Sequence, residues 1–318
     1  MIDLCLCTHD PEPRLLARVI RALAAQSAGG GAFRVLLLDS ATRVPLSSAL
    51  LAPLGAAGIE ARLVREPAPG LVQARLRCIE ETAAPWLLFV DDDTVLAPDF
   101  IAEGIAFAAA RPDVGAFGGK LLLPEEVRAP AWARPFFSFL ALRDDGDEVI
   151  AGSSDDWGLW EPPGAGLFVR REVAEEFRRR FGGDPRIRAL GRRGRRGLSS
   201  GEDALLVRQA RRLDLVTAYV PALVLHHHLR PGRFRLRYLL PFMAAHGRSV
   251  VQTELLTKGR VEVPAYYLGP IRIYKTIHGE WRRRRRQSWR FFLGKMAFHL
   301  GARRAYLELS RTPPAADR

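Results

Sequence analysis

The sequence predicts an α/β fold, with an open, mostly parallel sheet flanked by helices. Short apolar runs typical of buried strands alternate with helical patterns through residues 1–123. Several of these runs end abruptly in polar or acidic residues, at Thr8, Asp39 and 91–93. In open sheets of this class, ligands bind at the carboxyl ends of the strands. The sequence therefore predicts a Rossmann-like open sheet with a ligand site at the edge where the strands end.

Composition narrows the class of protein. With 318 residues, 48% of them hydrophobic, the chain can bury a large core, and its net charge of +13 indicates anionic partners, whether nucleic acid, anionic lipid or sugar phosphate. We see no apolar run of about 18 residues and no leader-like N-terminus, so we expect cytoplasmic residence. Three cysteines are too few for a disulfide framework. We expect Cys5, Cys7 and Cys78 to be small buried apolar residues.

The first predicted strand, residues 2–7, stops at a polar cluster, Thr8-His9-Asp10. The residues that follow have the 3.6-residue period of a helix. A polar turn beside a helix N-terminus can bind a nucleotide, but it is equally the ordinary cap of a helix. Both interpretations stay open on these residues alone.

The next part of the chain repeats this alternation. A second buried strand, 33–38, ends at Asp39. An amphipathic helical segment is expected at 43–60, with a third short strand at 59–64. The helix that follows has two arginines near its start, the first of them Arg75. Guanidinium groups near a positive helix end can contact phosphate.

Residues 86–90 form an apolar run that ends in three adjacent carboxylates, Asp91, Asp92 and Asp93. Such acids repel one another by about 1 kcal/mol or more per close pair, so they commonly persist where a cation or a donor-rich ligand binds. Mg²⁺ and Mn²⁺ are typically held by one or two carboxylates together with substrate phosphates. The alternative is a solvated acidic turn that caps the segment opening near Pro98.

Beyond the acids we expect a helix at 101–110 and a glycine-bearing strand at 114–123. Residues 124–163 lose periodicity and gather aromatic side chains, which fit either stacking on sugar faces or packing in a core. These are Trp132, Phe136, Phe137, Phe139, Trp157 and Trp160. The basic loop 191–201 fits either closure over a diphosphate or an ordinary solvated loop.

Two groups of residues later in the chain have side chains suited to catalysis or to metal binding. Glu202 and Asp203 begin an amphipathic helix, where acids complement the helix dipole and where a carboxylate can also take a proton from a hydroxyl group. A last buried strand, 215–225, ends in three histidines, 226–228. Imidazole suits Mn²⁺, and a solvated strand end is the alternative.

These motifs together resemble a known family. Phe89-Val-Asp-Asp-Asp93, followed by Pro98-Asp99-Phe100, is similar to the Asp-x-Asp signature of family 2 glycosyltransferases. Other segments resemble this family's motifs in the family's order, across about residues 2 to 250. They are Cys7–Asp10, the strand end at Asp39, Gly70–Arg75, Pro162–Arg171, Gly201–Asp203 and Pro221–Arg233, which selects His227. Ala41 and Leu76 stand where the family has glycine and asparagine.

The resemblance implies a GT-A fold and an inverting transfer of a sugar in one displacement. It implies that the nucleotide is bound by Thr8, Asp10, Asp39, Arg75, Asp91 and Asp92. It implies that Mn²⁺ or Mg²⁺ is held by Asp91, Asp93 and His227. It also implies that Asp203 is the catalytic base, with Glu202 supporting orientation or acceptor binding.

The resemblance also suggests the substrates. Asp39 corresponds to an aspartate that accepts a hydrogen bond from the base, and a carboxylate can accept from the imide N–H of uracil or thymine, whereas cytosine offers an acceptor there. This contact favours a UDP- or dTDP-sugar donor, and we expect a UDP-sugar first. The expected acceptor is a hydroxyl group of a saccharide or a lipid-linked molecule, in cell-envelope or exopolysaccharide synthesis.

We expect a glycosyltransferase domain at 1–233, with a nucleotide-binding half at 1–123 and an acceptor half at 124–233, and a basic helical extension at 234–318. The extension fits either peripheral contact with an anionic membrane or a helix that covers the sheet. The alternative functions are a nucleotidyltransferase and a basic protein that binds nucleic acid or membrane. Nucleic-acid binding is disfavoured, because it explains the arginines but not the acids at the strand ends.

Overall fold

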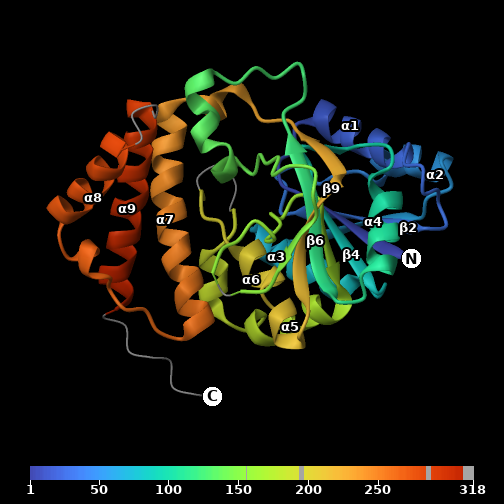
Figure 1. Ribbon diagram of the computed structural model, residues 1–318. Coiled ribbons are helices and arrows are strands. Elements are labelled where there is room, and N and C mark those ends of the chain that lie inside the picture. Colours follow the sequence, from blue (N-terminus) through green and yellow to red (C-terminus); the bar gives the residue numbers. More distant parts are fainter. Residues whose placement is uncertain (155, 193–196, 284–287, 311–318) are drawn as a thin grey trace. The chain divides into compact units, whose positions relative to one another are not determined.

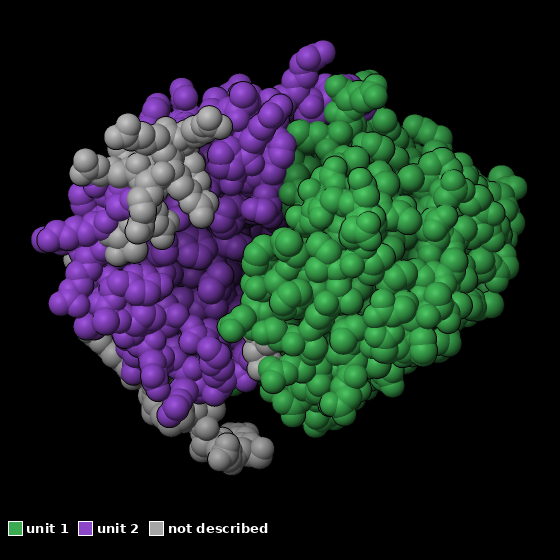
Figure 2. Space-filling model, viewed as in Figure 1, with its two compact units in different colours: residues 1–125, 141–188, 203–229 green, residues 126–140, 189–202, 230–318 purple. Residues whose placement is uncertain are grey.

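The computed structural model describes residues 1–154, 156–192, 197–283 and 288–310 (Figure 1). The chain forms two compact units, each assembled from separate stretches of sequence (Figure 2). Unit 1 contains residues 1–125, 141–188 and 203–229, and unit 2 contains 126–140, 189–202 and 230–318. The domain boundary expected between residues 233 and 234 stays a prediction.

In the described part of the chain, unit 1 is built on a nine-stranded sheet. Eight strands follow the order β3-β2-β1-β4-β8-β6-β9-β5, and the ninth, β7, also pairs with β9. β1, β2, β3 and β4 run parallel, whereas β8 is antiparallel to both β4 and β6. The strands are β1 (Ile2–Thr8), β2 (Phe33–Ser40), β3 (Ala61–Glu66), β4 (Trp86–Asp91), β5 (Thr94–Leu96), β6 (Val114–Leu122), β7 (Ile150–Gly152), β8 (Leu167–Arg170) and β9 (Val216–His227). The predicted open α/β fold is confirmed.

The helices of unit 1 follow the strands in the expected alternation. They are α1 (Pro13–Ala24), α2 (Ala52–Ala56), α3 (Leu71–Glu81), α4 (Phe100–Ala110), α5 (Arg171–Phe181) and α6 (Glu202–Val207, whose first residue belongs to unit 2). The helix expected over 43–60 is much shorter, a 3₁₀ turn at Ser48–Leu51 followed by α2. Pro45, Gly55 and Gly58 explain the difference, because proline and glycine disfavour a continuous helix.

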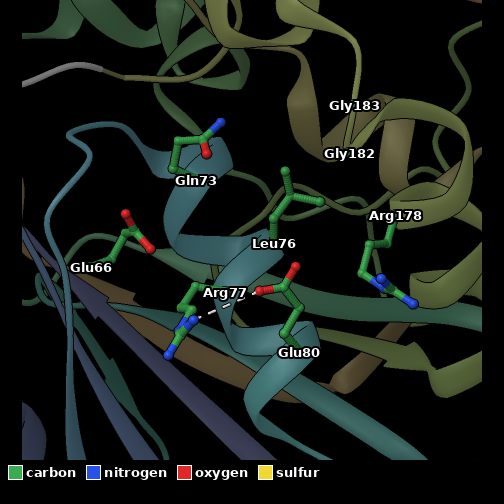
Figure 3. Close-up of a pocket in the computed structure, with 8 residues that line it drawn as sticks. All are labelled: Glu66, Gln73, Leu76, Arg77, Glu80, Arg178, Gly182 and Gly183. Carbon is green, nitrogen blue, oxygen red and sulfur yellow. Dashed lines mark ion pairs between the residues drawn. The ribbon is translucent and has the colours of Figure 1, made fainter.

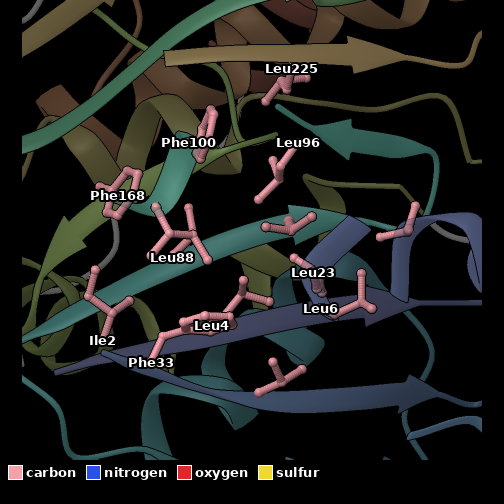
Figure 4. Close-up of a cluster of buried hydrophobic side chains, with 14 of the residues drawn as sticks. Ile2, Leu4, Leu6, Leu23, Phe33, Leu88, Leu96, Phe100, Phe168 and Leu225 are labelled. Atoms are coloured by element: carbon pink, nitrogen blue, oxygen red, sulfur yellow. The ribbon is translucent and has the colours of Figure 1, made fainter. Parts of the chain in front are cut away.

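The core of unit 1 lies on the central strands. Every residue of β1 is buried, and β2 and β4 are nearly as enclosed, as expected of parallel strands covered on both faces. In Figure 4, Leu4, Phe33 and Leu88 from these three strands pack with Leu23 from α1. Cys5, Cys7 and Cys78 are buried and form no disulfide, as predicted. This core holds the carboxyl ends of the strands in fixed register.

β9 carries the histidines into the sheet. It runs parallel to β6, with a register shift between Gly118 and Lys120, and then continues antiparallel to β5. At the irregularity, Pro221 cannot donate a ladder hydrogen bond, and a side chain at Gly119 would collide with the carbonyl oxygen of Leu223. Beyond this bulge β9 stays paired with β6 up to His226, while its other edge, which pairs with β7 at 217–219, pairs with β5 at 225–227.

Unit 2 is helical. Its long helices are α7 (Leu236–Lys258), α8 (Pro270–Arg283) and α9 (Trp289–Leu309), coloured orange to red in Figure 1. α7 and α9 approach closely because each has a glycine against the other's backbone. A Cβ at Gly247 would collide with the carbonyl oxygen of Phe298, and one at Gly301 with that of Ala244. Within the described ranges, no helix is both long enough and apolar enough to cross a membrane.

The aromatic residues of 124–163 have different surroundings. Phe136 is fully buried in unit 2 and packs edge-on against Phe291 of α9, with ring centroids 5.1 Å apart. Trp132 packs against Phe136 in the same way, at 6.3 Å. Phe136 therefore serves as core and Trp132 is half-buried beside it, whereas Trp157 of unit 1 is 67% exposed.

Candidate active site

The three carboxylates follow β4 at the carboxyl edge of the sheet. Asp91 is the last residue of β4 and lies opposite Cys7 of β1. The next residue of β1, Thr8, donates its hydroxyl hydrogen bond to the Asp92 carboxylate. Burial, and then the charge of Asp93, raise the pKa of Asp92 to about 7. The acids are therefore crowded and partly desolvated, as expected of a site that receives positive charge.

The strand pairing brings His227 to these acids. β9 places His227 opposite Thr94, and its Nε2 lies 3.5 Å from Oδ1 of Asp93. The backbone N–H of His228 donates to the carbonyl oxygen of Asp93 at 2.8 Å, which fixes the two strands at this point. His226 pairs opposite Val95, one residue away, so its side chain lies on the other face of the ladder.

Asp93 and His227 fit part of a divalent cation site. Carboxylate oxygen and imidazole nitrogen both suit Mn²⁺, and the buried Nδ1 of His227 has no hydrogen-bond partner. Among the residues that the structure describes, no three His, Cys, Asp or Glu side chains gather closely enough to hold a metal. Asp91 therefore does not complete a three-residue cluster. A cation that takes its other ligands from water and substrate phosphate fits this pair.

Asp39 lies near the end of β2, and its carboxylate accepts hydrogen bonds from the segment that follows this strand. Asp39 is 1% exposed and lies in register with Thr8. Its carboxylate accepts backbone hydrogen bonds from Thr42 at 2.9 Å and Leu46 at 3.2 Å, and Arg65 lies 3.4 Å away. Asp39 thus shapes the loop after its strand. A carboxylate has about four acceptor positions, so these contacts leave room for a further donor.

The turn after β1 is tied to the same loop. Nδ1 of His9 donates to the carbonyl oxygen of Ser40 at 2.6 Å. Asp10 has a positive φ of 46° and accepts from the backbone N–H of Arg43 at 3.0 Å and from its guanidinium at 2.7 Å. The Arg43 hydrogen bonds lower the pKa of Asp10. Asp10 therefore joins the turns after β1 and β2.

Arg75 lies inside unit 1. It is 2% exposed, its guanidinium lies 5.5 Å from the centre of the Phe89 ring in β4, and its Nη2 donates to the carbonyl oxygen of Gly164 at 3.2 Å. A side chain at Gly164 would displace this guanidinium. The close approach explains why glycine occupies the position. The expected phosphate contact of Arg75 stays a prediction.

Asp203 also contacts Gly164, through the backbone N–H of this glycine. Its Oδ2 accepts the backbone N–H of Gly164 at 2.9 Å, and its Oδ1 accepts that of Ala204 at 2.9 Å. Glu202, the preceding residue, is 4% exposed. Gly164 thus connects the predicted base with Arg75, and both of its backbone polar groups take part.

The pairing of β8 with β4 connects Gly164 to the acids. Leu167, three residues after Gly164, begins β8 opposite Phe89 of β4. Because the two strands are antiparallel, the residues before Leu167 continue toward the end of β4, where Asp91 begins the acidic run. The structure therefore brings Asp203 and Arg75 toward the strand end that carries the acids, within unit 1.

Sequence reasoning missed a buried ion pair beside Asp203. Glu161 is 8% exposed and accepts from Nε and Nη2 of Arg208 at 3.1 and 3.0 Å. Burial raises the pKa of Glu161 to about 7, against the opposing effect of Arg208. The pair links the segment that contains Gly164 to the residue just after α6. An acid immediately before Pro162-Pro163-Gly164 was the available signal.

A shallow pocket of about 240 Å³ lies elsewhere on unit 1 (Figure 3). It is lined by Glu66, Gln73, Leu76, Arg77, Glu80, Arg178, Gly182 and Gly183. Figure 3 shows Arg77 and Glu80 of α3 facing one another, 4.0 Å apart. None of the predicted site residues lines this pocket, and its charged groups compensate one another. It does not account for the acids at the strand ends.

The basic loop 191–201 lies partly outside the described residues, which omit 193–196. In its described part, Ser200 is held by α7: its hydroxyl hydrogen-bonds Nδ1 of His246 at 2.8 Å, and its N–H donates to Ser249 at 3.1 Å. Closure of the loop over a diphosphate stays a prediction.

Comparison with known proteins bears on the fold and on the family. No curated protein sequence matches the chain. The fold is similar to a mannosyltransferase, PcManGT, from Pyrobaculum calidifontis (TM-score 0.60, 14% identity, covering 96% of this chain and 86% of that one). It is also similar to TarS from S. aureus (TM-score 0.51, 12% identity, covering 96% of this chain), and the chain spans 55% of the length of TarS.

These likenesses show the fold, which is that of GT-A glycosyltransferases, as predicted. A family model described as glycosyltransferase-like family 2 matches residues 6–239, the greater part of the chain. This match supports the expectation of a glycosyltransferase enzyme. The chain belongs to glycosyltransferase-like family 2.

Proposed function

We propose that the chain is an inverting glycosyltransferase that moves a sugar from a nucleotide-diphosphate donor to a hydroxyl group. A UDP-sugar is the first candidate donor, because of Asp39. The proposed acceptor is a saccharide or a lipid-linked molecule of cell-envelope or exopolysaccharide synthesis. Family membership over residues 6–239 supports the reaction class.

The observation that carries the proposal is the set of contacts around Gly164. Its N–H holds the Asp203 carboxylate at 2.9 Å while its carbonyl oxygen holds Arg75 at 3.2 Å. The carboxylate of the candidate base, Asp203, and the guanidinium of Arg75, which suits phosphate, are thus both held by the backbone of Gly164. Hydrogen bonds of this kind orient a base before substrate arrives, which favours proton transfer in the transition state.

In the proposed step, Asp203 takes the proton of the acceptor hydroxyl group as its oxygen attacks the anomeric carbon. The new carbon–oxygen bond forms while the bond from the anomeric carbon to the diphosphate breaks. The nucleoside diphosphate leaves with the bonding electron pair, and the configuration at the anomeric carbon inverts. Arg75 is the proposed partner of the charge that develops on the diphosphate.

Asp93 and His227 are the residues that would hold Mn²⁺ or Mg²⁺, with Asp91 as the further predicted ligand. A bound cation supplies Lewis-acid neutralisation of the leaving diphosphate. The solved PcManGT structure is a complex with GDP-Man and Mn²⁺, which supports a metal-linked donor for this chain. It also makes GDP-sugars the second class to test.

The test is a donor screen with the full chain. UDP-, GDP- and dTDP-sugars are each added with Mn²⁺, with Mg²⁺ or with EDTA, and thermal shift and release of nucleoside diphosphate are measured. We expect one donor class to raise the melting temperature and to be hydrolysed slowly in the presence of the metal. If no nucleotide-sugar binds or turns over with either metal, the proposed function is wrong.

A further inference from the structure

The charge of the chain is divided very unevenly between its two units. Unit 2 contains 26 lysines and arginines against 7 aspartates and glutamates, a net charge of +19. Unit 1 contains 22 against 28, a net charge of −6. The excess of positive charge seen in the composition therefore lies in unit 2. Unit 1, which carries the candidate active site, is acidic.

α8 shows two opposite faces within unit 2. Ile273 and Ile277 are buried, and they pack in a core cluster with Tyr267, Ala302 and Tyr306. α9 packs against α8 as well as α7, as Figure 1 shows for these helices. The helix is therefore anchored by its buried face, and Tyr274 on the outer side also contacts Phe292 of α9, with ring centroids 6.2 Å apart.

The other face of α8 is apolar and exposed. Ile271 is 69% exposed and Tyr274 is 48% exposed, three residues apart on the same side of the helix. Leu268, in the turn just before α8, is 60% exposed. Isolated exposed apolar residues are normal, but Ile271 and Tyr274 share one side of α8, and Leu268 is exposed just before the helix, so this short segment presents several apolar side chains to water.

Basic residues flank these apolar side chains. Arg272 and Lys275 are exposed and alternate with Ile271 and Tyr274 along α8. Further along the sequence stand five consecutive arginines, 282–286, of which 284–286 lie outside the described residues. Such a combination of an apolar face and clustered positive charge is typical of helices that lie in the headgroup region of anionic membranes.

We propose that the α8 outer face, made of Leu268, Ile271, Arg272, Tyr274 and Lys275, docks on an anionic lipid bilayer. The apolar side chains enter the boundary between headgroups and acyl chains, and the basic side chains contact lipid phosphate. A nucleic acid would satisfy the basic side chains but leave Leu268 and Ile271 in water. This inference goes beyond the proposed sugar transfer and does not rest on it.

The test measures binding of the full chain to two kinds of vesicle, phosphatidylcholine alone and equimolar phosphatidylcholine with phosphatidylglycerol, by co-sedimentation. We expect binding only to the anionic vesicles, with weaker binding at high salt. The double variant Leu268→Ser/Ile271→Ser keeps every charge. It should lower the affinity for anionic vesicles about tenfold or more, because it removes two aliphatic side chains that the proposal places inside the bilayer.

A matched control removes two exposed aliphatic side chains from unit 1. Val44 and Val149 are 77% and 45% exposed, and Val44→Ser/Val149→Ser should bind vesicles like the parent. Circular dichroism and melting curves check that both variants fold. The proposal is overturned if the parent ignores anionic vesicles, or if both double variants bind them equally well. It is also overturned if single-stranded RNA competes with the vesicles and binds the Leu268→Ser/Ile271→Ser variant unchanged, because the surface would then recognise polyanions through charge alone.

These outcomes separate the docking surface from the enzyme. Vesicle binding needs no nucleotide-sugar, and the donor screen needs no lipid. A chain that binds vesicles but turns over no donor would support the surface and reject the proposed function. A chain that turns over a donor without binding vesicles would do the reverse.

Discussion

The two units use charge in opposite ways. Unit 1 gathers acids where the ends of β1, β2 and β4 meet, and there burial raises the pKa of Asp92 to about 7. Unit 2 has an excess of +19 in its sequence, and basic residues such as Arg272 and Lys275 of α8 are exposed. Solvated charges repel one another weakly because water screens them, whereas crowded, partly buried charges raise the energy of the fold. The difference shows that the positive net charge of the chain comes from unit 2, whereas the proposed chemistry uses acids of unit 1.

The two units also differ in the kind of contact that holds each of them together. Unit 1 depends on pairing between strands distant in sequence, such as Phe89 with Leu167 and Thr94 with His227. Unit 2 depends on the contact between α7 and α9, made possible by Gly247 and Gly301. Substitutions in unit 1 should therefore change chemistry and donor binding, whereas packing substitutions in unit 2 should change stability first. Four predictions test this contrast.

The largest effect is expected at Asp203. Asp203→Asn removes the proposed base while keeping its size, and transfer should fall by about 10²–10⁴-fold with donor affinity nearly unchanged. Turnover and donor binding are measured separately, by product release and calorimetry. Asp214→Asn is the matched control, because asparagine tolerates its left-handed φ of 57°. Near-normal turnover in Asp203→Asn would remove Asp203 from this role.

The next effect is expected at the cation site. Asp93→Asn weakens a candidate ligand beside His227, and metal-dependent donor binding should fall by about 10–100-fold, in the range found when metal-site partners are changed. Donor titrations with Mn²⁺ and with EDTA measure the metal-dependent part. Asp147→Asn, at an exposed carboxylate paired with Lys120, serves as the control. Equal stimulation by Mn²⁺ in parent and Asp93→Asn would contradict the assignment.

A third prediction concerns unit 2. Gly247→Ala forces a Cβ against the backbone carbonyl of Phe298, so the free energy of unfolding should fall by about 1–3 kcal/mol. Gly279→Ala in α8 meets nothing within 4 Å, and it should be neutral or stabilising by up to about 1 kcal/mol, because alanine favours helix. Chemical denaturation measures both. Equal stability of the two variants would show that α7 and α9 do not need this close approach.

The smallest effect concerns the pH dependence of stability. The fold raises the pKa of Glu161 to about 7 from the usual 4.5, so the folded chain keeps a proton that the unfolded chain has lost. Stability from this group is full below about pH 4.5 and is lost as the pH rises through about 7. Glu161→Gln should remove this loss, a difference on the order of 1 kcal/mol between pH 5 and 8.

Denaturation curves at several pH values measure this difference. The comparison of Glu161→Gln with the parent cancels other groups that titrate in the same range, including Asp92. If the parent and the variant lose stability in parallel between pH 5 and 8, Glu161 does not titrate there and Arg208 holds it ionised.

Much of the fold was predictable from local pattern. Apolar runs that end in polar residues predicted β1, β2 and β4 because buried parallel strands must be continuously apolar. The segment 43–60 was less predictable: its apolar spacing suggested one helix, but Pro45, Gly55 and Gly58 shorten it. Strand order was not readable, because pairs such as β4 with β8 join residues about 80 positions apart and leave no local pattern.

For the candidate site, motifs predicted residue types but not their partners. The run of acids and the three histidines were visible in the sequence, and the family resemblance of Pro221–Arg233 selected His227 among them. The 3.5 Å approach of His227 to Asp93 depends on the antiparallel pairing of β5 with β9. Glu161 was overlooked because an ion pair with Arg208 joins two segments that have no common motif.

The sequence by itself determined the fold class, the family resemblance and the kinds of side chain available for chemistry, because apolar periodicity and short motifs are local properties. Only the tertiary structure decided that Gly164 joins Asp203 to Arg75, that Glu161 is buried with Arg208, and that the positive charge is concentrated in one unit. These facts depend on which distant segments pack together. That choice is made by the burial of a whole core and not by any one stretch of the chain.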